Sequence, residues 1–251
     1  MNKIAFITGA TSGIGQATAL KTAEAGYDLI ITGRRKERLE AMAQKIREKG
    51  VEVLPLCFDV RNQQEVHQAV QGLTGKWQNI DVLVNNAGLA VGVTPIQEGI
   101  LDDWERMIDT NVKGLLYITR EVAPLMIRRQ KGHIVNIAST AGKEVYPGGN
   151  VYCATKHAVD ALSKAMRIDM LKDHIKVTNI APGMVETEFS LVRYKGDAEA
   201  AKNVYTGLTP LSNEDIANVI VFAISCPEHV CLNDIVITPT AQANARDVVR
   251  K

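Results

Sequence analysis

Tyr152 and Lys156 lie four residues apart, in the string Tyr-Cys-Ala-Thr-Lys. On a helix this spacing places a phenol and an ammonium on one face. A nearby cation favours the phenolate, so we expect Lys156 to lower the pKa of Tyr152 from its reference of about 10 toward the working pH. Such a pair is suited to moving a proton to or from a substrate oxygen. Taken alone, the spacing also fits a half-buried aromatic beside a solvated charge.

A glycine-rich turn follows the first apolar run of the chain. Residues 8–15 read Thr-Gly-Ala-Thr-Ser-Gly-Ile-Gly and open a helical pattern. Glycines at a strand-to-helix turn let the backbone approach a pyrophosphate, and the helix N-terminus offers free N–H donors. In this context the turn predicts a dinucleotide site. Its expected members are Gly9, Thr11, Ser12, Gly13, Ile14 and Gly15.

Two arginines follow the second apolar run. Arg34 and Arg35 come directly after Gly33, where a protein that prefers NAD usually carries an acid for the ribose hydroxyls. Guanidinium groups bind a 2′-phosphate through charge-assisted bonds, so we predict NADP as the cofactor. The alternative is that both arginines only solubilise the following helix. Asp59 and Val60, after the third run, are further cofactor candidates; Asp59 either accepts from the adenine amino group or caps the next helix.

Short apolar runs alternate with longer helical patterns along the whole chain. The expected strands are 4–8, 28–32, 52–57, 82–85, 133–138, 176–181 and 234–238, and the expected helices include 14–25, 36–49, 102–129 and 151–172. This alternation predicts an α/β, doubly wound Rossmann-type fold, in which helices cover both faces of a parallel sheet. The length of 251 residues, without a linker-like stretch, indicates a single domain over 1–251. The polar stretch at about 186–211 is expected to be a mobile substrate loop over the ligand crevice, or else a passive surface insertion.

The composition favours small-molecule chemistry in the cytoplasm. Lys and Arg number 29 against 28 for Asp and Glu, which gives no electrostatic reason to expect nucleic acid or a membrane surface as a partner. The first residues do not resemble a signal peptide, and no apolar run approaches the roughly 18 residues of a membrane span. The four cysteines are scattered, so we expect reduced thiols and no metal site. Cys153 is expected to be a small apolar filler beside Tyr152.

Five motifs occur in an order that is typical of one protein family. They are the glycine turn, Asn-Asn-Ala-Gly at 85–88, Asn-Val-Lys-Gly at 111–114, Ser139, and the pair Tyr152 and Lys156. On these motifs, and over essentially its whole length, the chain resembles a short-chain dehydrogenase/reductase (SDR). The resemblance implies hydride transfer between a nicotinamide coenzyme and the hydroxyl or carbonyl carbon of a small substrate.

The resemblance also implies roles for individual residues. Tyr152 would be the general acid/base, and Lys156 would lower its pKa and bind the nicotinamide ribose. Ser139 would hold the substrate oxygen, and Asn111 would place a water that links Lys156 to solvent. A carbonyl that accepts hydride gains negative charge on oxygen, which a hydroxyl and an acidic phenol stabilise and protonate. Further cofactor contacts are implied at Asn86, Ala87, Gly88, Pro182, Gly183, Val185 and Thr187, with Asn85 steadying the sheet. Thr187 is alternatively an ordinary loop hydroxyl.

Several strings are similar to the SDR subgroup that oxidises 3-hydroxy acids, such as serine, allo-threonine or 3-hydroxypropionate, with NADP. They lie at 33–39, 139–142, 148–152, 187–197 and 238–242. A carboxylate substrate needs a cation near the crevice. Arg193 is the first candidate for substrate binding, beside Ser139 and Tyr152, and Lys143 is the second; a plain surface charge is the alternative for each.

Other functions share much of this pattern. A general carbonyl or 3-oxoacyl reductase would carry the same catalytic residues. A nucleotide-sensing protein would keep the fold without the chemistry, although such proteins usually lose the tyrosine or the lysine, which this chain retains. Sugar-nucleotide epimerases carry a larger C-terminal domain, so the length argues against them.

Relatives in this family are usually tetramers or dimers. They join through the helices expected here at 102–129 and 151–172, so the resemblance implies a homotetramer. Residues 238–251 run past the last expected strand. They either pack on a neighbouring subunit or form a frayed terminus.

Overall fold

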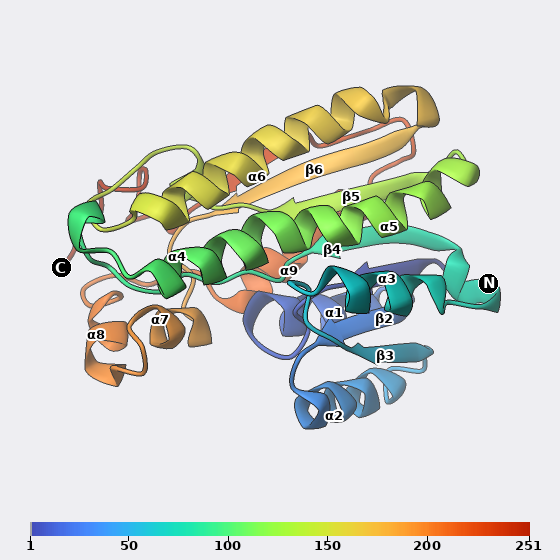
Figure 1. Ribbon diagram of the computed structural model, residues 1–251, viewed down its shortest axis with the longest axis horizontal. Coiled ribbons are helices and arrows are strands. Elements are labelled where there is room, and N and C mark those ends of the chain that lie inside the picture. The colour runs from blue at the N-terminus through green and yellow to red at the C-terminus, as the bar shows by residue number, and fades with distance from the viewer. Residues whose placement is uncertain (1) are drawn as a thin grey trace.

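One parallel sheet of seven strands forms the centre of the structure, a computed structural model that describes residues 2–251 (Figure 1). The strand order is β3-β2-β1-β4-β5-β6-β7, and each neighbouring pair is parallel. The strands are β1 (Ile4–Ile7), β2 (Asp28–Gly33), β3 (Val53–Cys57), β4 (Ile80–Asn85), β5 (Gly132–Ile137), β6 (Ile175–Pro182) and β7 (Asp234–Ile237). All seven expected strands are confirmed, with small differences at their ends.

Helices cover both faces of the sheet, which confirms the doubly wound fold. They are α1 (Gly13–Glu24), α2 (Lys36–Arg47), α3 (Gln63–Gln71), α4 (Leu101–Ile108), α5 (Leu115–Arg128), α6 (Asn150–Asp169), α7 (Glu188–Arg193), α8 (Ala198–Asn203) and α9 (Asn213–Ser225). Helices α3, α5 and α6 contribute to one apolar core, and α1, α2 and α9 to the other. Side chains of β1 alternate between the two, with Phe6 in the first core and Ile7 in the second.

The helix expected at 102–129 is interrupted in its middle. Residues Asp109–Gly114 form a π-helical segment between α4 and α5. Gly114 lies tightly against Val60, because a Cβ there would come within 2.9 Å of the valine Cγ2. The wider turn carries Asn111, and such segments are frequent at functional sites.

The segment at 186–211 is more regular than its composition indicates. It contains α7 and α8, and each helix begins at a capping side chain. Thr187 accepts from the Phe189 amide at 3.0 Å, and Asp197 accepts from the Ala200 amide at 3.0 Å. The mobility of this segment stays a prediction.

The last residues fold back onto their own chain. The Lys251 amide donates to the Gly207 carbonyl at 2.9 Å, and Arg246 Nε donates to the Val145 carbonyl at 2.8 Å. The tail therefore packs against the segment that follows α8 and against the loop before α6 of its own chain. Among residues 2–251, none of the helices combines the length and apolarity that a bilayer crossing needs.

Candidate active site

A cavity of about 710 Å³ opens at the carboxyl end of the sheet. This is where ligands bind in open α/β sheets, and the volume suits a small-molecule site. Most of the predicted site residues line it: Gly9, Thr11, Ser12, Gly13, Ile14, Arg34, Arg35, Asp59, Val60, Asn86, Ala87, Gly88, Ser139, Tyr152, Lys156, Pro182, Gly183, Val185, Thr187 and Arg193. Gly15 and Asn111 do not line it; they pack directly behind its wall.

The glycine turn forms one wall because side chains do not fit there. A Cβ on Gly15 would lie 2.3 Å from the Gly9 carbonyl oxygen, so only glycine lets α1 begin this close to β1. Gly13 has a φ of +54°, which disfavours other residues. Asn86 braces the turn from β4 by donating to the Thr8 carbonyl at 2.8 Å. The start of α1 thus faces the cavity with bare backbone, which fits a pyrophosphate.

Arg34 and Arg35 lie at the end of β2 and flank the same wall. Arg35 Nη2 donates to Ser12 Oγ at 2.9 Å and to Thr11 Oγ1 at 3.1 Å. Arg34 is more than half exposed and lies 3.7 Å from an Asp59 carboxylate oxygen. Two guanidinium groups and two hydroxyls therefore converge at one end of the cavity, a donor set that suits a phosphate.

Asp59 is held by a neighbouring arginine. Arg61 donates to its carboxylate through Nε at 3.0 Å and Nη2 at 2.7 Å. Although partial burial opposes the effect, these bonds hold the pKa of Asp59 below its ordinary value. The alternative that Asp59 caps the next helix is wrong, because Asn62 caps α3 by accepting from the Gln64 amide at 3.1 Å.

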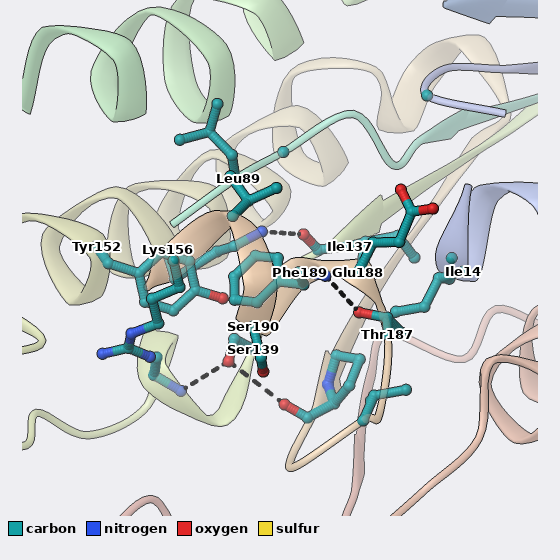
Figure 2. Close-up of a pocket in the computed structure, with 18 of the residues that line it drawn as sticks. Ile14, Leu89, Ile137, Ser139, Tyr152, Lys156, Thr187, Glu188, Phe189 and Ser190 are labelled. Atoms are coloured by element: carbon teal, nitrogen blue, oxygen red, sulfur yellow. Dashed lines mark hydrogen bonds between the residues drawn. The ribbon is translucent and has the colours of Figure 1, made fainter. Parts of the chain in front are cut away.

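The Tyr152 and Lys156 side chains lie buried on α6, at the other end of the cavity (Figure 2). Lys156 Nζ donates to the Ile137 carbonyl at 2.8 Å and lies 5.9 Å from the centre of the Tyr152 ring. Burial lowers the pKa of Lys156 to about 8. Burial also raises the pKa of Tyr152 above its ordinary value, although a hydrogen bond with Ser139 opposes this. The expected lowering of the tyrosine pKa is therefore wrong in this structure, because desolvation outweighs the opposing hydrogen bond of Ser139 and charge of Arg193.

Ser139 follows β5 and is fixed by backbone groups on both sides. Its Oγ accepts from the Ala141 amide at 3.1 Å and donates to the Pro182 carbonyl at 3.4 Å. Figure 2 shows the serine on the same side of the cavity as Tyr152 and Lys156. A substrate oxygen placed between Ser139 and Tyr152 meets two hydroxyl groups.

Asn111 is buried in the π-helical segment and secures the loop after β4. Its Oδ1 accepts from the Leu89 amide at 2.8 Å, and its Nδ2 donates to the Leu89 carbonyl at 2.8 Å and to Thr155 Oγ1 at 3.0 Å. These contacts tie the loop after β4 to α6, one residue before Lys156. The side chain thus positions the lysine's helix, and its role in holding a water stays a prediction.

Arg193, at the end of α7, lies directly beside the catalytic pair. Its guanidinium carbon is 5.8 Å from the Tyr152 ring centre and 5.2 Å from that of Tyr146, and Nη1 donates to the Tyr146 hydroxyl at 2.9 Å. Arg193 Nε is buried and has no hydrogen-bond partner among residues 2–251. A buried guanidinium N–H without a partner is costly, so the arrangement favours an anionic ligand here.

Two aromatic residues at this end were missed by the sequence analysis. Tyr146 holds Arg193, and Phe189 of α7 meets the Tyr152 ring edge-on, with centroids 5.6 Å apart. Tyr146 lies outside the strings that the sequence analysis singled out, and Phe189 lies within the string at 187–197 without a role of its own. Only the long-range approach of α7 to α6 brings them to the site, and no spacing in the sequence signals it.

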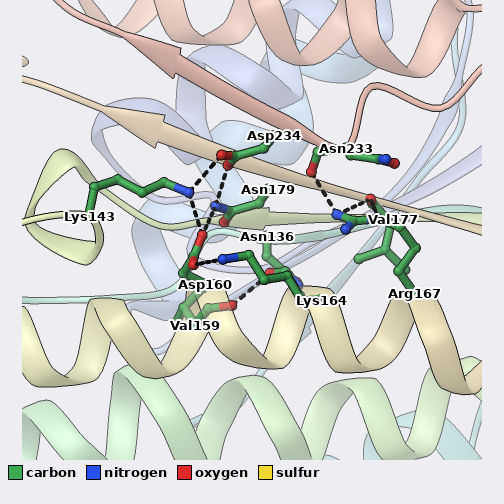
Figure 3. A network of polar contacts seen from close by, with 11 residues as sticks. Asn136, Lys143, Val159, Asp160, Lys164, Arg167, Val177, Asn179, Asn233 and Asp234 are labelled. Carbon is green, nitrogen blue, oxygen red and sulfur yellow. Dashed lines mark hydrogen bonds and ion pairs between the residues drawn. The ribbon is translucent and has the colours of Figure 1, made fainter.

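Lys143, the second candidate for a carboxylate, is engaged elsewhere. It forms ion pairs with Asp160 and Asp234, and Asn179 donates to both of these aspartates (Figure 3). This network joins α6, β6 and β7 and does not line the cavity. Lys143 is therefore a structural residue, and its assignment as a substrate cation is wrong.

Asn85, at the end of β4, holds neighbouring elements together, as the sequence analysis expects. Asn85 Nδ2 donates to Thr119 Oγ1 at 3.0 Å and to Asn136 Oδ1 at 2.9 Å, which ties β4 to α5 and β5.

The four cysteines are free thiols, and Cys153 is fully buried in an apolar cluster with Tyr152. In the part of the chain that the structure describes, no His, Cys, Asp and Glu side chains gather in a metal-binding group.

Comparison with known proteins identifies the class that this fold and site define. The sequence model for short chain dehydrogenases matches residues 3–196. The chain therefore belongs to the short-chain dehydrogenase family.

Several members of the family are similar over nearly their whole length. NADP-dependent 3-hydroxy acid dehydrogenase YdfG of Salmonella typhi is 46% identical over 96% of this chain and 97% of that protein. Serine 3-dehydrogenase of Agrobacterium fabrum is 43% identical over 98% and 97%. Among solved structures, the closed form of a serine dehydrogenase complexed with NADP+ has a TM-score of 0.92 and 42% identity, with 99% of each chain covered.

Proposed function

We propose that this protein is an NADP-dependent oxidoreductase that transfers a hydride between the nicotinamide and the hydroxyl-bearing carbon of a small 3-hydroxy acid. One observation carries the proposal: Arg193, whose guanidinium keeps one buried nitrogen without a partner among residues 2–251, lines the same cavity as Tyr152 and Ser139. The names of the similar proteins, 3-hydroxy acid and serine dehydrogenases that use NADP, support the same substrate class.

The cavity fits the coenzyme by the chemistry of its donors. The bare glycine backbone at the start of α1 would receive the pyrophosphate. Arg34 and Arg35, with Ser12, would hold a 2′-phosphate, and Lys156 would hold the nicotinamide ribose. When bound, the coenzyme supplies the hydride chemistry.

Tyr152 moves the proton in this mechanism. During oxidation the deprotonated oxygen of Tyr152 takes the proton of the substrate hydroxyl, and during reduction the neutral phenol returns it. Ser139 would turn its hydroxyl from the Pro182 carbonyl to the substrate oxygen and stabilise the charge that develops there. Lys156 lies beside the tyrosine ring, and its positive charge would favour the phenolate that the oxidation direction requires. Phe189 and Arg193 cover the tyrosine and limit the access of water.

Arg193 is the residue that would bind the carboxylate of the proposed substrate. Nη1 is fixed by Tyr146, so the guanidinium is oriented before the substrate arrives. The guanidinium lines the cavity and would form a charge-assisted bond to a carboxylate there. A hydroxyl held at Ser139 and Tyr152 and a carboxylate held at Arg193 must belong to one short molecule, which a 3-hydroxy acid satisfies.

Initial rates of NADP+ reduction test the proposal. We expect serine, allo-threonine or 3-hydroxypropionate to react faster than neutral secondary alcohols of the same size, and NADP+ to be preferred over NAD+. Arg34→Ala is expected to raise the KM for NADP+ about tenfold and to leave that for NAD+ nearly unchanged, since only NADP+ carries the 2′-phosphate. Activity confined to neutral alcohols or acyl thioesters would instead assign a general carbonyl or 3-oxoacyl reductase.

The same proposal includes a homotetramer in the cytoplasm. Large apolar side chains are exposed on the helices expected to join subunits, including Leu101 of α4 at 70% and Ile168 of α6 at 75%. Exposed apolar side chains on neighbouring helices favour burial against another subunit. Free cysteines and the near balance of charge agree with a reducing compartment.

A further inference from the structure

Glu188, the first residue of α7, lies across the cavity mouth from the arginines at the start of α2. Its carboxylate is 3.4 Å from Arg35 Nη1 and 3.1 Å from Arg38 Nη1. All three side chains are about half exposed, with 52% for Glu188, 44% for Arg35 and 51% for Arg38. We call these ion pairs the Glu188 clasp.

The clasp joins two walls of the cavity. Arg35 reaches Ser12 and Thr11 of the glycine turn with Nη2 while Nη1 faces Glu188. Beside it, the Thr187 side chain is 3.6 Å from the position a Cβ on Gly13 would occupy. Figure 2 shows Thr187 and Glu188 next to Ile14. The coenzyme phosphates proposed for the glycine turn would therefore lie beneath this closure.

The other end of α7 is fixed more firmly. The Gly92 amide donates to the Arg193 carbonyl at 2.9 Å, and Lys195 pairs with the buried Asp103 at 2.7 Å. Between the two ends, Phe189 covers the Tyr152 ring. Helix α7 is thus held near its C-terminal end by a pair with the buried Asp103. Its N-terminal end is held by exposed ion pairs, which salt screens.

We propose that Glu188 is a positioning residue that retains the coenzyme: its pairs with Arg35 and Arg38 fasten α7 over the cavity, and the coenzyme is released when they open. The inference rests on the proposed function, since it requires NADP(H) in the cavity. Exposed ion pairs are weak and screened by salt. Release of the coenzyme often limits the rate of such enzymes. Weak ion pairs suit a closure that must open in every turnover, because they add little to the barrier for release.

The release rate of NADPH tests the proposal. NADPH is bound to the full-length protein and displaced by excess NADP+ in a stopped-flow instrument, with nicotinamide fluorescence as the signal. Glu188→Gln is expected to speed release about threefold, which is the size of effect that exposed pairs give. Raising the salt to about 0.5 M is expected to speed release from the unmodified protein more than from Glu188→Gln, in which only the bonds of the arginines to the coenzyme phosphate are left to be screened.

Two further variants separate the clasp from other effects. Arg38 does not line the cavity, and Arg38→Gln removes only one of the two ion pairs, so it is expected to speed release less than Glu188→Gln does; the double variant is expected to release NADPH no faster than Glu188→Gln alone. Glu186→Gln removes an exposed carboxylate of the same segment outside the clasp and is expected to leave release unchanged.

Each other outcome has a definite meaning. Unchanged release from both Glu188→Gln and Arg38→Gln, with normal NADPH binding, would overturn the clasp and leave the proposed function intact. An effect of Glu188→Gln without an effect of Arg38→Gln would also overturn it, because Glu188 would then act on the coenzyme directly. Failure of the unmodified protein to bind NADPH would overturn the proposed function itself.

Discussion

At the scale of single residues, burial decides the electrostatics of the site. The four-residue spacing correctly places Tyr152 and Lys156 together, yet it does not reveal that both are buried. Desolvation disfavours the charged form of each, which raises the pKa of the tyrosine and lowers that of the lysine. Burial thus favours the neutral phenol of Tyr152, the form that protonates a carbonyl oxygen in the reduction direction.

Arg193 is the residue that distinguishes an acid from a neutral substrate. We expect Arg193→Gln to raise the KM for a 3-hydroxy acid about 10- to 100-fold, since a hydrogen bond to a charged group is worth about 1.5–3 kcal/mol. The KM for a neutral alcohol is expected to change little. Steady-state kinetics with both substrates check this, and Tyr146→Phe, which removes only the partner of Nη1, is expected to give a smaller acid-specific loss. Equal losses for acid and alcohol would contradict the role.

At the scale of elements, the strands and the helices between them could be predicted, whereas the segments that close the cavity, chiefly α7, could not. Seven apolar runs identify seven strands because a buried parallel strand is apolar along its length. The π-helical segment at Asp109–Gly114 and the helices α7 and α8 have no comparable signal, since tertiary contacts fix them. The placement of Arg193 beside Tyr146, and of Glu188 beside Arg38, depends on residues far apart in the chain.

His133 of β5 makes the sheet sensitive to acid. It is 3% exposed and lies 2.8 Å from Thr178 of β6; burial, aided by Lys176, lowers its pKa to about 3. The unfolded chain titrates near the ordinary value of about 6.5. Between these values only the unfolded chain binds the proton, so the free energy of unfolding falls as the pH falls below about 6.5.

Urea unfolding at fixed protein concentration checks this sign and size. From about pH 7.5 to pH 5, the unmodified protein is expected to lose about 2 kcal/mol more than His133→Asn loses. The exposed His229→Asn serves as the control and is expected to keep the full pH dependence. An identical pH dependence in His133→Asn and the unmodified protein would contradict the buried, neutral histidine.

At the scale of the whole molecule, the cavity lies where distant parts of one chain meet. The carboxyl ends of the strands supply the coenzyme wall, α6 supplies the reacting pair, and α7 with the tail closes the opening. The tail packs on its own chain and leaves Leu101 of α4 and Ile168 of α6 exposed, and these are the side chains that we propose for contacts between subunits.

Light scattering tests the proposed assembly. The purified protein is expected to have the mass of four chains. Leu101→Glu and Ile168→Glu each place a charge on an exposed apolar position and are expected to lower the mass, because a buried, unpaired charge opposes association. A fully active monomer would contradict the tetramer.

Tyr152→Phe tests the central claim most directly, because it removes one oxygen atom and keeps the ring that packs on Phe189. The measurement is the rate of NADP+ reduction with the best 3-hydroxy acid, together with NADPH binding. The account predicts that turnover falls about 10²- to 10⁴-fold while NADPH still binds. Turnover that persists near the unmodified rate would contradict the assignment of Tyr152 as the proton-transferring residue, and with it the proposed mechanism.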